Sequence, residues 1–328
     1  MKNLTQKETQ QLINRMMTGE MSRVEMGKML KNLAQKGETP DEIIGAIGAL
    51  RSRMQTLQAP IGSVDTCGTG GDGKNTFNVS TAVALVVAGT GVSVAKHGNR
   101  KASSSCGSAD VLEALGANIN LTPDQAKNVL ESIGIVFLFA QLYHPAMKYV
   151  ASVRKELEIR TIFNFIGPFC NPAGVRRQVV GVPNLEVLET LSHVAKELEY
   201  EYLALVTSKD GMDEISPAAP SYTRIIKNSH VSSLEIDPKK YGFHDESIED
   251  IIGGDVQKNA SIIRNILNGV KGAQRDTVLL NAAMALLVSG KATTIEHGLK
   301  LAAKSIDSRA AKHTLEALIH SSHNHEYS

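Results

Sequence analysis

A short apolar segment leads directly into a glycine-dense loop in the stretch Ser63-Val64-Asp65-Thr66-Cys67-Gly68-Thr69-Gly70-Gly71-Asp72-Gly73. Its first residues predict a short strand, because Ala59-Pro60 ends the helical pattern that precedes them. Glycines accept positive φ angles and let backbone N–H groups converge on an anion, so the loop is predicted to hold phosphate. A tight turn without a ligand is an equally good interpretation of this motif by itself.

The rest of the chain alternates between strand and helix patterns, which predicts an α/β fold with a mostly parallel central sheet flanked by helices. Further strands are expected at residues 92–95, 135–139, 179–182 and 202–206. Between them, helices are expected to begin near Ser80, Ser108, Thr122, His144 and Leu185. Residues 221–237 alternate around Asn228-Ser229 and predict an antiparallel excursion. Four more helices are expected at residues 259–267, 276–287, 294–306 and 308–319.

The first sixty residues predict a smaller, all-helical domain. Three capping side chains are each followed three residues later by a glutamate: Thr5 by Glu8, Ser22 by Glu25 and Thr39 by Glu42. Apolar residues follow each of these starts at helical spacing. This segment therefore differs in class from the α/β pattern that follows it.

The charge balance and the cysteines exclude several classes of protein. Lysine and arginine (35) nearly cancel aspartate and glutamate (34) in the 328 residues, so no attraction to nucleic acid or to a membrane surface is expected. The three cysteines are too widely spread for a disulfide framework or a CxxC zinc site. The first residues lack a secretory signal, and no apolar run reaches membrane-spanning length. A cytoplasmic enzyme with small-molecule substrates is predicted.

Two more polar clusters follow the glycine-rich loop. Asn78-Val79-Ser80-Thr81 precedes an apolar run, so Ser80 or Thr81 is expected to cap a helix whose positive end attracts phosphate, with capping alone as the simpler alternative. The cluster at residues 96–104 follows the expected strand 92–95, and ligands of open α/β sheets bind at that end of a strand. Three such segments within about forty residues favour a ligand with more than one phosphate.

Adjacent carboxylates occur at Asp213-Glu214, in a loop after the expected strand 202–206. A solvated acidic turn is the default interpretation. Next to phosphate-binding loops, Mg²⁺ is preferred, because it is usually held by one or two carboxylates together with water and substrate phosphates. Asp72 supports this interpretation, since a carboxylate beside phosphates repels them unless a cation intervenes.

Several stretches taken together resemble the anthranilate phosphoribosyltransferase family, and the resemblance covers essentially the whole chain from about residue 60. These stretches occur in the order expected for the family. They are Asp65-Thr66-Cys67-Gly68-Thr69-Gly70-Gly71-Asp72, Asn78-Val79-Ser80-Thr81, Lys96-His97-Gly98-Asn99-Arg100, Gly107-Ser108-Ala109-Asp110-Val111-Leu112-Glu113-Ala114-Leu115-Gly116, Arg160-Thr161-Ile162-Phe163-Asn164, Gly167-Pro168 with Asn171-Pro172, and Asp210-Gly211-Met212-Asp213-Glu214.

The resemblance implies a reaction: transfer of the phosphoribosyl group of phosphoribosyl diphosphate (PRPP) to the amino group of anthranilate with the help of Mg²⁺. It implies that PRPP contacts Gly68, Gly71, Asp72, Thr76, Asn78, Val79, Ser80, Thr81, Lys96, His97, Gly98, Asn99, Ser103, Ser104 and Ser108. Anthranilate is expected near Gly68, Asn99, His144, Arg154, Gly167 and Pro168. Two Mg²⁺ ions are expected at Ser80, Asp213 and Glu214.

The resemblance also implies that the chemistry needs no general acid or base. The aniline nitrogen is a neutral nucleophile, and departure of diphosphate leaves a ribosyl cation, so little proton transfer precedes bond breaking. His97 and His144 are therefore interpreted as residues that position substrate, as are Asn99 and Arg154. A guanidinium suits a carboxylate because its fork pairs two N–H donors with two oxygens.

The family architecture implies a helical domain of residues 1–62 plus about 155–178 and an α/β domain of residues 63–154 plus about 179–328, with the site between them. A homodimer through the helical domain is also implied. The chain departs from the usual family pattern at Lys101, Ser105 and Gln141.

Two alternatives to this family were weighed against the residues. A pyrimidine-nucleoside phosphorylase shares the implied fold, but it typically carries Lys-His-Ser ahead of its glycines, where this chain has Asp65-Thr66-Cys67. A catalytically silent nucleic-acid-binding relative predicts a strong basic excess, whereas the formal net charge is +1.

Overall fold

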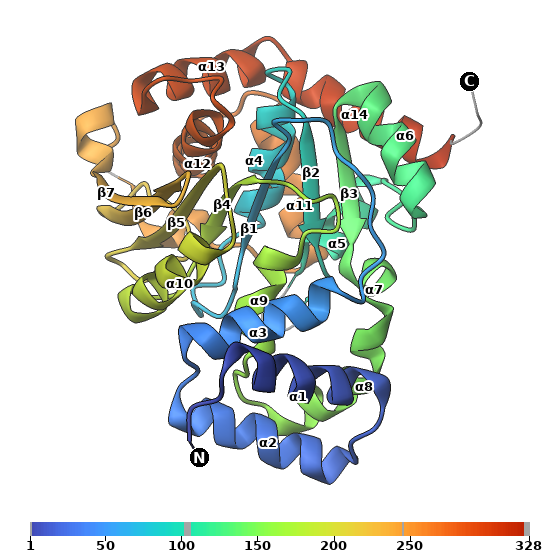
Figure 1. The fold of residues 1–328 in the computed structure, drawn as a ribbon. Coiled ribbons are helices and arrows are strands. Elements are labelled where there is room, and N and C mark those ends of the chain that lie inside the picture. Colours follow the sequence, from blue (N-terminus) through green and yellow to red (C-terminus); the bar gives the residue numbers. More distant parts are fainter. Residues whose placement is uncertain (1, 102–105, 245, 325–328) are drawn as a thin grey trace.

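A seven-stranded sheet forms the centre of the molecule, in the order β3-β2-β1-β4-β5-β6-β7 (Figure 1). The structure is a computed structural model and describes residues 2–101, 106–244 and 246–324. The first five strands are parallel and the last two are antiparallel, which confirms the predicted fold class. The strands are β1 (Val64–Gly68), β2 (Val94–Gly98), β3 (Ile135–Phe139), β4 (Arg177–Gly181), β5 (Tyr202–Ser208), β6 (Ser221–Lys227) and β7 (His230–Ile236).

One strand lies further along the chain than its sequence pattern indicated. The prediction ended this strand at residue 95, whereas β2 continues to Gly98, because Lys96 and His97 pair with Phe137 and Leu138 of β3. Both polar side chains are buried, with 3% and 7% of their surface exposed. The cluster that was expected to follow the strand therefore begins inside it.

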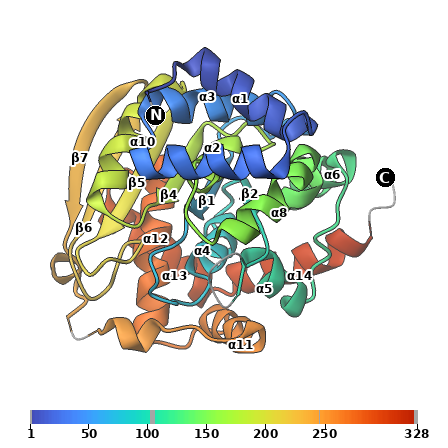
Figure 2. The same ribbon diagram turned by 90° about the horizontal axis from the view of Figure 1, so that it is seen from below.

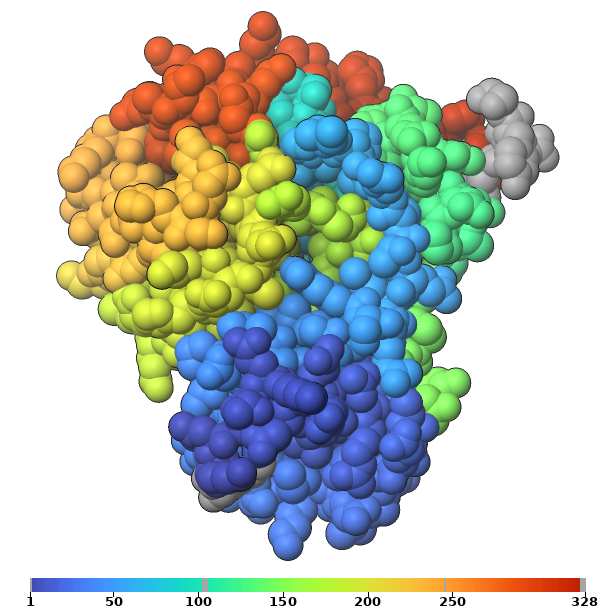
Figure 3. Space-filling model, in the orientation of Figure 1, coloured from blue at the N-terminus to red at the C-terminus, as the bar shows by residue number. Residues whose placement is uncertain are grey.

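Three N-terminal helices begin where the capping pattern predicted. They are α1 (Gln6–Thr18), α2 (Arg23–Lys36) and α3 (Pro40–Arg51), and each has a complete capping box. Their apolar faces share a core with α8 (Lys148–Leu157) and α9 (Phe163–Ile166). Figure 2 shows α1, α2 and α3 next to one another, with α8 close to α2. In the space-filling view, these helices form a narrower end below the wider α/β part (Figure 3).

Helices cover both faces of the sheet. One face packs against helices of the α/β part, and α12 and α4 contact β1 directly. The other face packs against α10 and shares its core with the N-terminal helices. The remaining long helices are α4 (Val79–Ala88), α5 (Ser108–Leu115), α6 (Pro123–Ile133), α10 (Leu185–Glu197), α11 (Val256–Leu267), α12 (Ala273–Ser289), α13 (Ile295–Asp307) and α14 (Ala310–His323).

The helix predicted to begin near His144 starts there with a 3₁₀ turn, Pro145–Met147, which leads directly into α8 (Lys148–Leu157). A short helix, α7 (Ala140–Tyr143), ends before His144. His144 has φ −121° and ψ 61°, outside the helical region. A proline disfavours helical geometry in the residue before it, so Pro145 explains the break. Within the described residues, no helix has the length and apolar composition to cross a membrane.

Candidate active site

The ends of four neighbouring strands bring the predicted ligand-binding segments to one edge of the sheet. β1 lies between β2 and β4, and Gly68 at its end is in register with Gly181 at the end of β4. The next strand along this edge is β5, whose Val206 pairs with Gly181. β1 is also the point where consecutive strands go to opposite sides, and ligands of open α/β sheets bind at such points.

The glycine-rich loop turns at this edge through residues with positive φ. Gly70, Gly71 and Gly73 have φ values of 67°, 85° and 72°, in the left-handed region that favours glycine. The loop is tied to the neighbouring strand by Thr69, whose N–H donates to the Gly181 carbonyl at 2.9 Å. Glycine at these positions leaves the backbone open to a ligand.

Three carboxylates meet beside this loop. Asp72, Asp213 and Glu214 each offer an oxygen, and these oxygens lie within 4.8 Å of one another. Burial, together with the charge of Asp72, raises the pKa of Asp213 to about 6. Burial and the charge of Asp213 raise the pKa of Glu214 well above its ordinary value. Oxygen ligands crowded in this way fit a hard divalent cation such as Mg²⁺, which would relieve their repulsion.

The loop that carries two of these carboxylates is held by residues the sequence prediction missed. Asn281 of α12 accepts from the Ile215 N–H at 2.9 Å and donates to the Ile215 carbonyl at 2.8 Å. The Asp213 N–H donates to Asp72 Oδ2 at 3.3 Å. Gly181 lies so close that a Cβ there would be 1.6 Å from the Asp213 carbonyl oxygen. The positions of the carboxylates are therefore set from three separate elements.

A buried lysine closes the inner side of the site. Lys96 Nζ donates to the Thr66 carbonyl at 2.5 Å and to Ser80 Oγ at 3.1 Å. Ser80 lines a small cleft together with Asp213 and Glu214. Ser80 therefore faces the same space as the two carboxylates with which it was predicted to bind Mg²⁺.

The predicted cap of the next helix is wrong. α4 begins at Val79, so Asn78 occupies the capping position and Ser80 and Thr81 lie inside the first turn. The Asn78 side chain makes no cap hydrogen bond and donates instead to the Cys106 carbonyl at 3.0 Å. No side chain caps this positive helix end, although the Val79 and Thr81 N–H groups donate to the Phe77 and Asn78 carbonyls at 2.6 and 3.2 Å.

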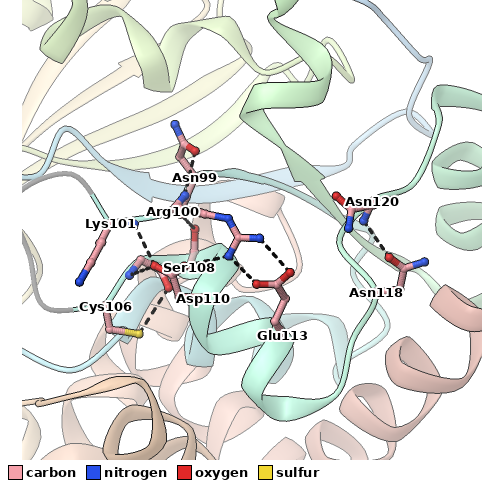
Figure 4. Close-up of polar contacts among 10 residues, drawn as sticks. Asn99, Arg100, Lys101, Cys106, Ser108, Asp110, Glu113, Asn118 and Asn120 are labelled. Carbon is pink, nitrogen blue, oxygen red and sulfur yellow. Dashed lines mark hydrogen bonds and ion pairs between the residues drawn. The ribbon is translucent and has the colours of Figure 1, made fainter. Parts of the chain in front are cut away.

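The segment after β2 is organised by an aspartate of α5 (Figure 4). Asp110 accepts from the backbone N–H groups of Lys101 and Gly107 at 2.9 and 3.0 Å. The Arg100 side chain is turned toward α5, where it pairs with Asp110 at 3.0 Å and with Glu113. Arg100 is thus used within the protein and not held free for phosphate. The predicted PRPP contacts Ser103 and Ser104 lie outside the described residues, as does Ser105.

The other predicted PRPP contacts differ in how accessible they are at this edge of the sheet. Ser108 Oγ donates to the Asn99 carbonyl at 3.3 Å, and the Asn99 side chain is exposed. Thr76 forms an isolated bridge with Ile252. The Val79 side chain is 1% exposed in the core, so only its backbone is available to a ligand.

Two histidines from different elements face each other beside the site. Nε2 of His97 and Nε2 of His144 are 3.2 Å apart, so one ring donates a hydrogen to the other. Burial, reinforced by His144 and Lys96, lowers the pKa of His97 well below its ordinary value. Burial also lowers the pKa of His144 to about 4. Both rings are neutral at pH 7, which suits positioning and not proton transfer.

Acidification is expected to destabilise the protein partly through His144. Its folded pKa of about 4 lies below the ordinary value of 6.5, so the unfolded chain binds a proton first. This contribution is complete above pH 6.5, is lost as the pH falls toward 4, and amounts to about 3 kcal/mol for a shift of this size. Urea unfolding at two pH values, one near neutral and one near the folded pKa, measures the change.

The variant His144→Gln lacks the titrating group, so its free energy of unfolding should fall less between the two pH values. His297→Gln, at an exposed histidine of α13, is the matched control and should behave like the parent protein. An equal fall in the parent and in His144→Gln would show that His144 is not held neutral by burial.

The expected acceptor residues lie on the side of the helical segment. The Arg154 guanidinium of α8 lies 5.5 Å from the centre of the Phe163 ring, and its side chain is half-buried. Burial lowers its pKa, and no carboxylate among the described residues pairs with it. Gly167 and Pro168 begin the 3₁₀ helix Gly167–Cys170. Arg154 therefore retains donors for an external carboxylate.

A buried polar network joins these acceptor-side residues to the sheet. Asp65 Oδ2 accepts from Asn171 at 2.9 Å and from Gln178 at 3.1 Å. Asp65 Oδ1 accepts from the His97 N–H at 3.2 Å. Gln178 also donates to the Pro168 carbonyl at 2.7 Å. One carboxylate thus fixes the backbone at both His97 and Pro168.

Comparison with known proteins assigns the family. A curated anthranilate phosphoribosyltransferase from Nitrobacter hamburgensis is 46% identical over 316 residues, which cover 96% of this chain and 94% of the relative. The chain belongs to the anthranilate phosphoribosyltransferase family. Two family models agree with this: one described as "Glycosyl transferase family, a/b domain" matches residues 61–312, and one described as "Glycosyl transferase family, helical bundle domain" matches residues 1–54.

Solved anthranilate phosphoribosyltransferases have the same fold. The enzyme from Thermus thermophilus superposes with a TM-score of 0.91 at 36% identity, covering 98% of this chain and 97% of that chain. The enzyme from Saccharomyces cerevisiae, solved in complex with PRPP and Mg, superposes with a TM-score of 0.90 at 24% identity and covers 98% of this chain and 94% of that chain. The second comparison bears on the fold alone.

Three residues that support the site of this anthranilate phosphoribosyltransferase family member were not predicted, and the sequence gave only weak signals for them. Gln178 is a polar residue directly ahead of the apolar pair Val179-Val180 in β4, and such a residue needs partners when buried. Gly181 ends the same strand. Asn281 lies within the apolar helix α12, where it gave no sign of the loop it contacts.

Proposed function

We propose that this chain transfers the 5-phosphoribosyl group of PRPP to the amino group of anthranilate. The products are N-(5-phosphoribosyl)anthranilate and diphosphate, and the reaction is the second step of tryptophan synthesis from chorismate. The proposal rests on one observation above all: the carboxylates Asp72, Asp213 and Glu214 converge beside the glycine-rich loop in a chain of this family.

The donor substrate carries three phosphates on one sugar, and the site offers separate anion-binding groups. The turn at Gly70 and Gly71 opens backbone N–H groups, the start of α4 is not capped by a side chain, and Lys96 supplies a buried cation. We assign PRPP to Gly68, Gly71, Asp72, Thr76, Asn78, Val79, Ser80, Thr81, Lys96, His97, Gly98, Asn99, Ser103, Ser104 and Ser108, as the family pattern implies.

We further propose that two Mg²⁺ ions bind with PRPP at Ser80, Asp213 and Glu214. The residues fit this role, because Glu214 Oε2 is buried without a hydrogen-bond partner among the described residues and the three carboxylates lie close enough to repel one another. Bound Mg²⁺ would neutralise charge on the departing diphosphate. The yeast relative was solved with PRPP and Mg. Asp72 belongs to the same carboxylate cluster and is proposed to help hold the metal.

The acceptor is proposed to lie between the helical segment and the sheet. Arg154 would pair with its carboxylate through a forked guanidinium. Asn99, His144, Gly167 and Pro168 would line the ring, together with Gly68. Because His144 is neutral at pH 7, it can contact the aromatic amine without charge repulsion.

The proposed reaction uses positioning and electrostatics, and no residue of this chain is assigned as general acid or base. The aromatic amine attacks the anomeric carbon as a neutral nucleophile, the bond to diphosphate breaks, and the ammonium proton leaves afterwards. The chain's contribution is to hold the amine beside the anomeric carbon and to exclude water. The neutral histidine pair agrees with this assignment.

The assembly and location of the protein are proposals of the same kind. We propose a homodimer through the helical part, a cytoplasmic location, and a division into residues 1–62 plus about 155–178 and residues 63–154 plus about 179–328. Packing of α8, which starts at Lys148, on α1 and α2 suggests that the second helical segment begins earlier than residue 155. Sedimentation equilibrium tests the dimer.

Loss of anthranilate fluorescence in the presence of PRPP and Mg²⁺ tests the proposed reaction. The same protein should show no phosphorolysis of thymidine with phosphate and no retention of DNA. No consumption of anthranilate at saturating PRPP would exclude the proposed function. Phosphorolysis of thymidine would instead support the phosphorylase alternative.

Arg154→Ala is expected to weaken the use of anthranilate by about 1.5–3 kcal/mol, the usual size of a charge-assisted contact. The physical reason is that no other guanidinium is assigned to the acceptor carboxylate. The KM for anthranilate at saturating PRPP is the measurement. Lys155→Ala, at the exposed neighbour on α8, is the control and should leave this KM unchanged. An unchanged KM in Arg154→Ala would refute the assignment.

A further inference from the structure

One arginine of the helical segment reaches the glycine-rich loop, although it had no role in the predicted site. Arg160 follows α8, and its Nη1 donates to the Gly71 carbonyl at 3.4 Å. A Cβ at Gly71 would lie 2.5 Å from the same nitrogen. Gly71 is therefore needed twice, for its φ of 85° and for the approach of this guanidinium.

Arg160 is followed by a hydrogen-bonded turn and by an aromatic ring that contacts its side chain. Thr161 N–H donates to Asn164 Oδ1 at 2.9 Å, and Asn164 N–H donates to the Thr161 carbonyl at 2.8 Å. The guanidinium carbon of Arg160 lies 5.6 Å from the centre of the Phe165 ring, within the range of a cation–π contact. The stretch 160–165 thus fixes a guanidinium against the loop.

A buried nitrogen of the Arg160 guanidinium is left for a ligand that accepts hydrogen bonds. Its Nη2 is buried and has no hydrogen-bond partner in the described parts of the chain. Burial lowers its pKa, while Asp213 and then Glu38 favour its charged form. A buried guanidinium nitrogen without a partner is costly, so a ligand that accepts its hydrogen bond would be favoured.

We propose that Arg160 is a binding residue for the diphosphate group of PRPP. The inference rests on the proposed function, and it adds a phosphate contact from the helical segment. We assign the diphosphate to Arg160 because this residue lies beside Gly71 and interacts electrostatically with Asp213. Both neighbours are on the side of the proposed metal site. Phosphate oxygens accept the forked N–H donors of arginine in a bidentate manner.

Isothermal titration of the full chain with PRPP in the presence of Mg²⁺ tests this assignment. Arg160→Met keeps an unbranched apolar side chain and removes the guanidinium with its charge, so PRPP should bind about 10- to 100-fold more weakly. Arg160→Lys keeps the charge without the fork and should fall between Met and the parent protein. Binding of inorganic diphosphate should weaken in parallel, whereas binding of ribose 5-phosphate should stay the same.

Two control variants separate binding from folding and from pairing inside the protein. Arg23→Met removes an exposed arginine of α2 that pairs with Glu156, and it should leave PRPP affinity unchanged. Glu38→Gln removes the second carboxylate that favours the charge of Arg160 and should also leave PRPP affinity unchanged. If Glu38→Gln weakened PRPP as much as Arg160→Met, Arg160 would act through Glu38 and the inference would be wrong.

The remaining outcomes each have one meaning. Parent-like affinity for PRPP and diphosphate in Arg160→Met would overturn the inference and leave the proposed function intact. Equal weakening of ribose 5-phosphate and diphosphate would also overturn it, because the contact would not be with the diphosphate. Failure of the parent protein to bind PRPP at all would instead overturn the proposed function.

Discussion

Turnover is expected to fall about 1000-fold or more when both metal-site carboxylates become amides, in Asp213→Asn with Glu214→Gln. The two amides keep the shape of the side chains but cannot balance the charge of a divalent cation. The affinity for Mg²⁺ in the presence of PRPP should also be lower in the same variant. Initial rates over a range of Mg²⁺ concentrations, with titration of PRPP, measure both effects.

The stability of this variant separates the loss of a ligand from the loss of the fold. Burial and repulsion between neighbouring carboxylates raise the pKa of Asp213 to about 6 and that of Glu214 well above its ordinary value, so their charged forms destabilise the metal-free protein near neutral pH. The amides should leave the free energy of unfolding unchanged or higher. Asp124→Asn with Glu131→Gln, two exposed positions on α6, makes the same change in net charge and should keep full activity. A full rate of the first variant at limiting Mg²⁺ would exclude the metal role.

Gly181→Ala is expected to have the second largest effect, although the change adds one methyl group. The new Cβ would lie 1.6 Å from the Asp213 carbonyl oxygen, and backbone at both places must move. Overpacking of this kind costs about 3 kcal/mol. A displacement of about 1 Å in the carboxylates is also expected to reduce turnover about 100-fold. Urea unfolding and initial rates measure the two effects.

A matched glycine on the helical side provides the control. Gly27 lies inside α2, and a Cβ there would meet the side chains of Leu157 and Val153 at 3.7 Å, an ordinary contact distance. Gly27→Ala should therefore be neutral or stabilise the protein by about 0.5–1 kcal/mol through helix propensity. Parent-like turnover and stability in Gly181→Ala would contradict the close packing of β4 against the carboxylate loop.

Local chemistry explains why most elements of the fold could be predicted. Thr5, Ser22 and Thr39 each form the capping box that their spacing indicated, because a capping box depends only on residues three positions apart. The hairpin of β6 and β7 turns at Asn228 and Ser229, which have φ values of 48° and 63°. These signals are local in the chain, so they are readable from sequence.

Contacts between distant residues explain what could not be predicted. Strand β2, which was predicted to end before Lys96, continues to Gly98 because β3 pairs with it. The pairing strand is distant in the sequence, so local patterns could not indicate this. Ser80 and Thr81 looked like helix caps, but α4 starts one residue earlier and the Ser80 hydroxyl accepts from Lys96. Contacts with residues distant in the sequence thus gave these residues roles other than the predicted ones.

The α/β class, the helical start, the glycine-rich loop and the pair Asp213-Glu214 could all be predicted from the amino-acid sequence. They could be predicted because propensity, capping and glycine content act over a few residues. Three features follow from the packing of the chain: Asp72 joins the carboxylate cluster, Asn281 and Gly181 hold the loop of Asp213 and Glu214, and Arg160 reaches Gly71. These contacts join residues up to 141 positions apart, as between Asp72 and Asp213, and only the packing of strands and helices brings such residues within hydrogen-bonding distance.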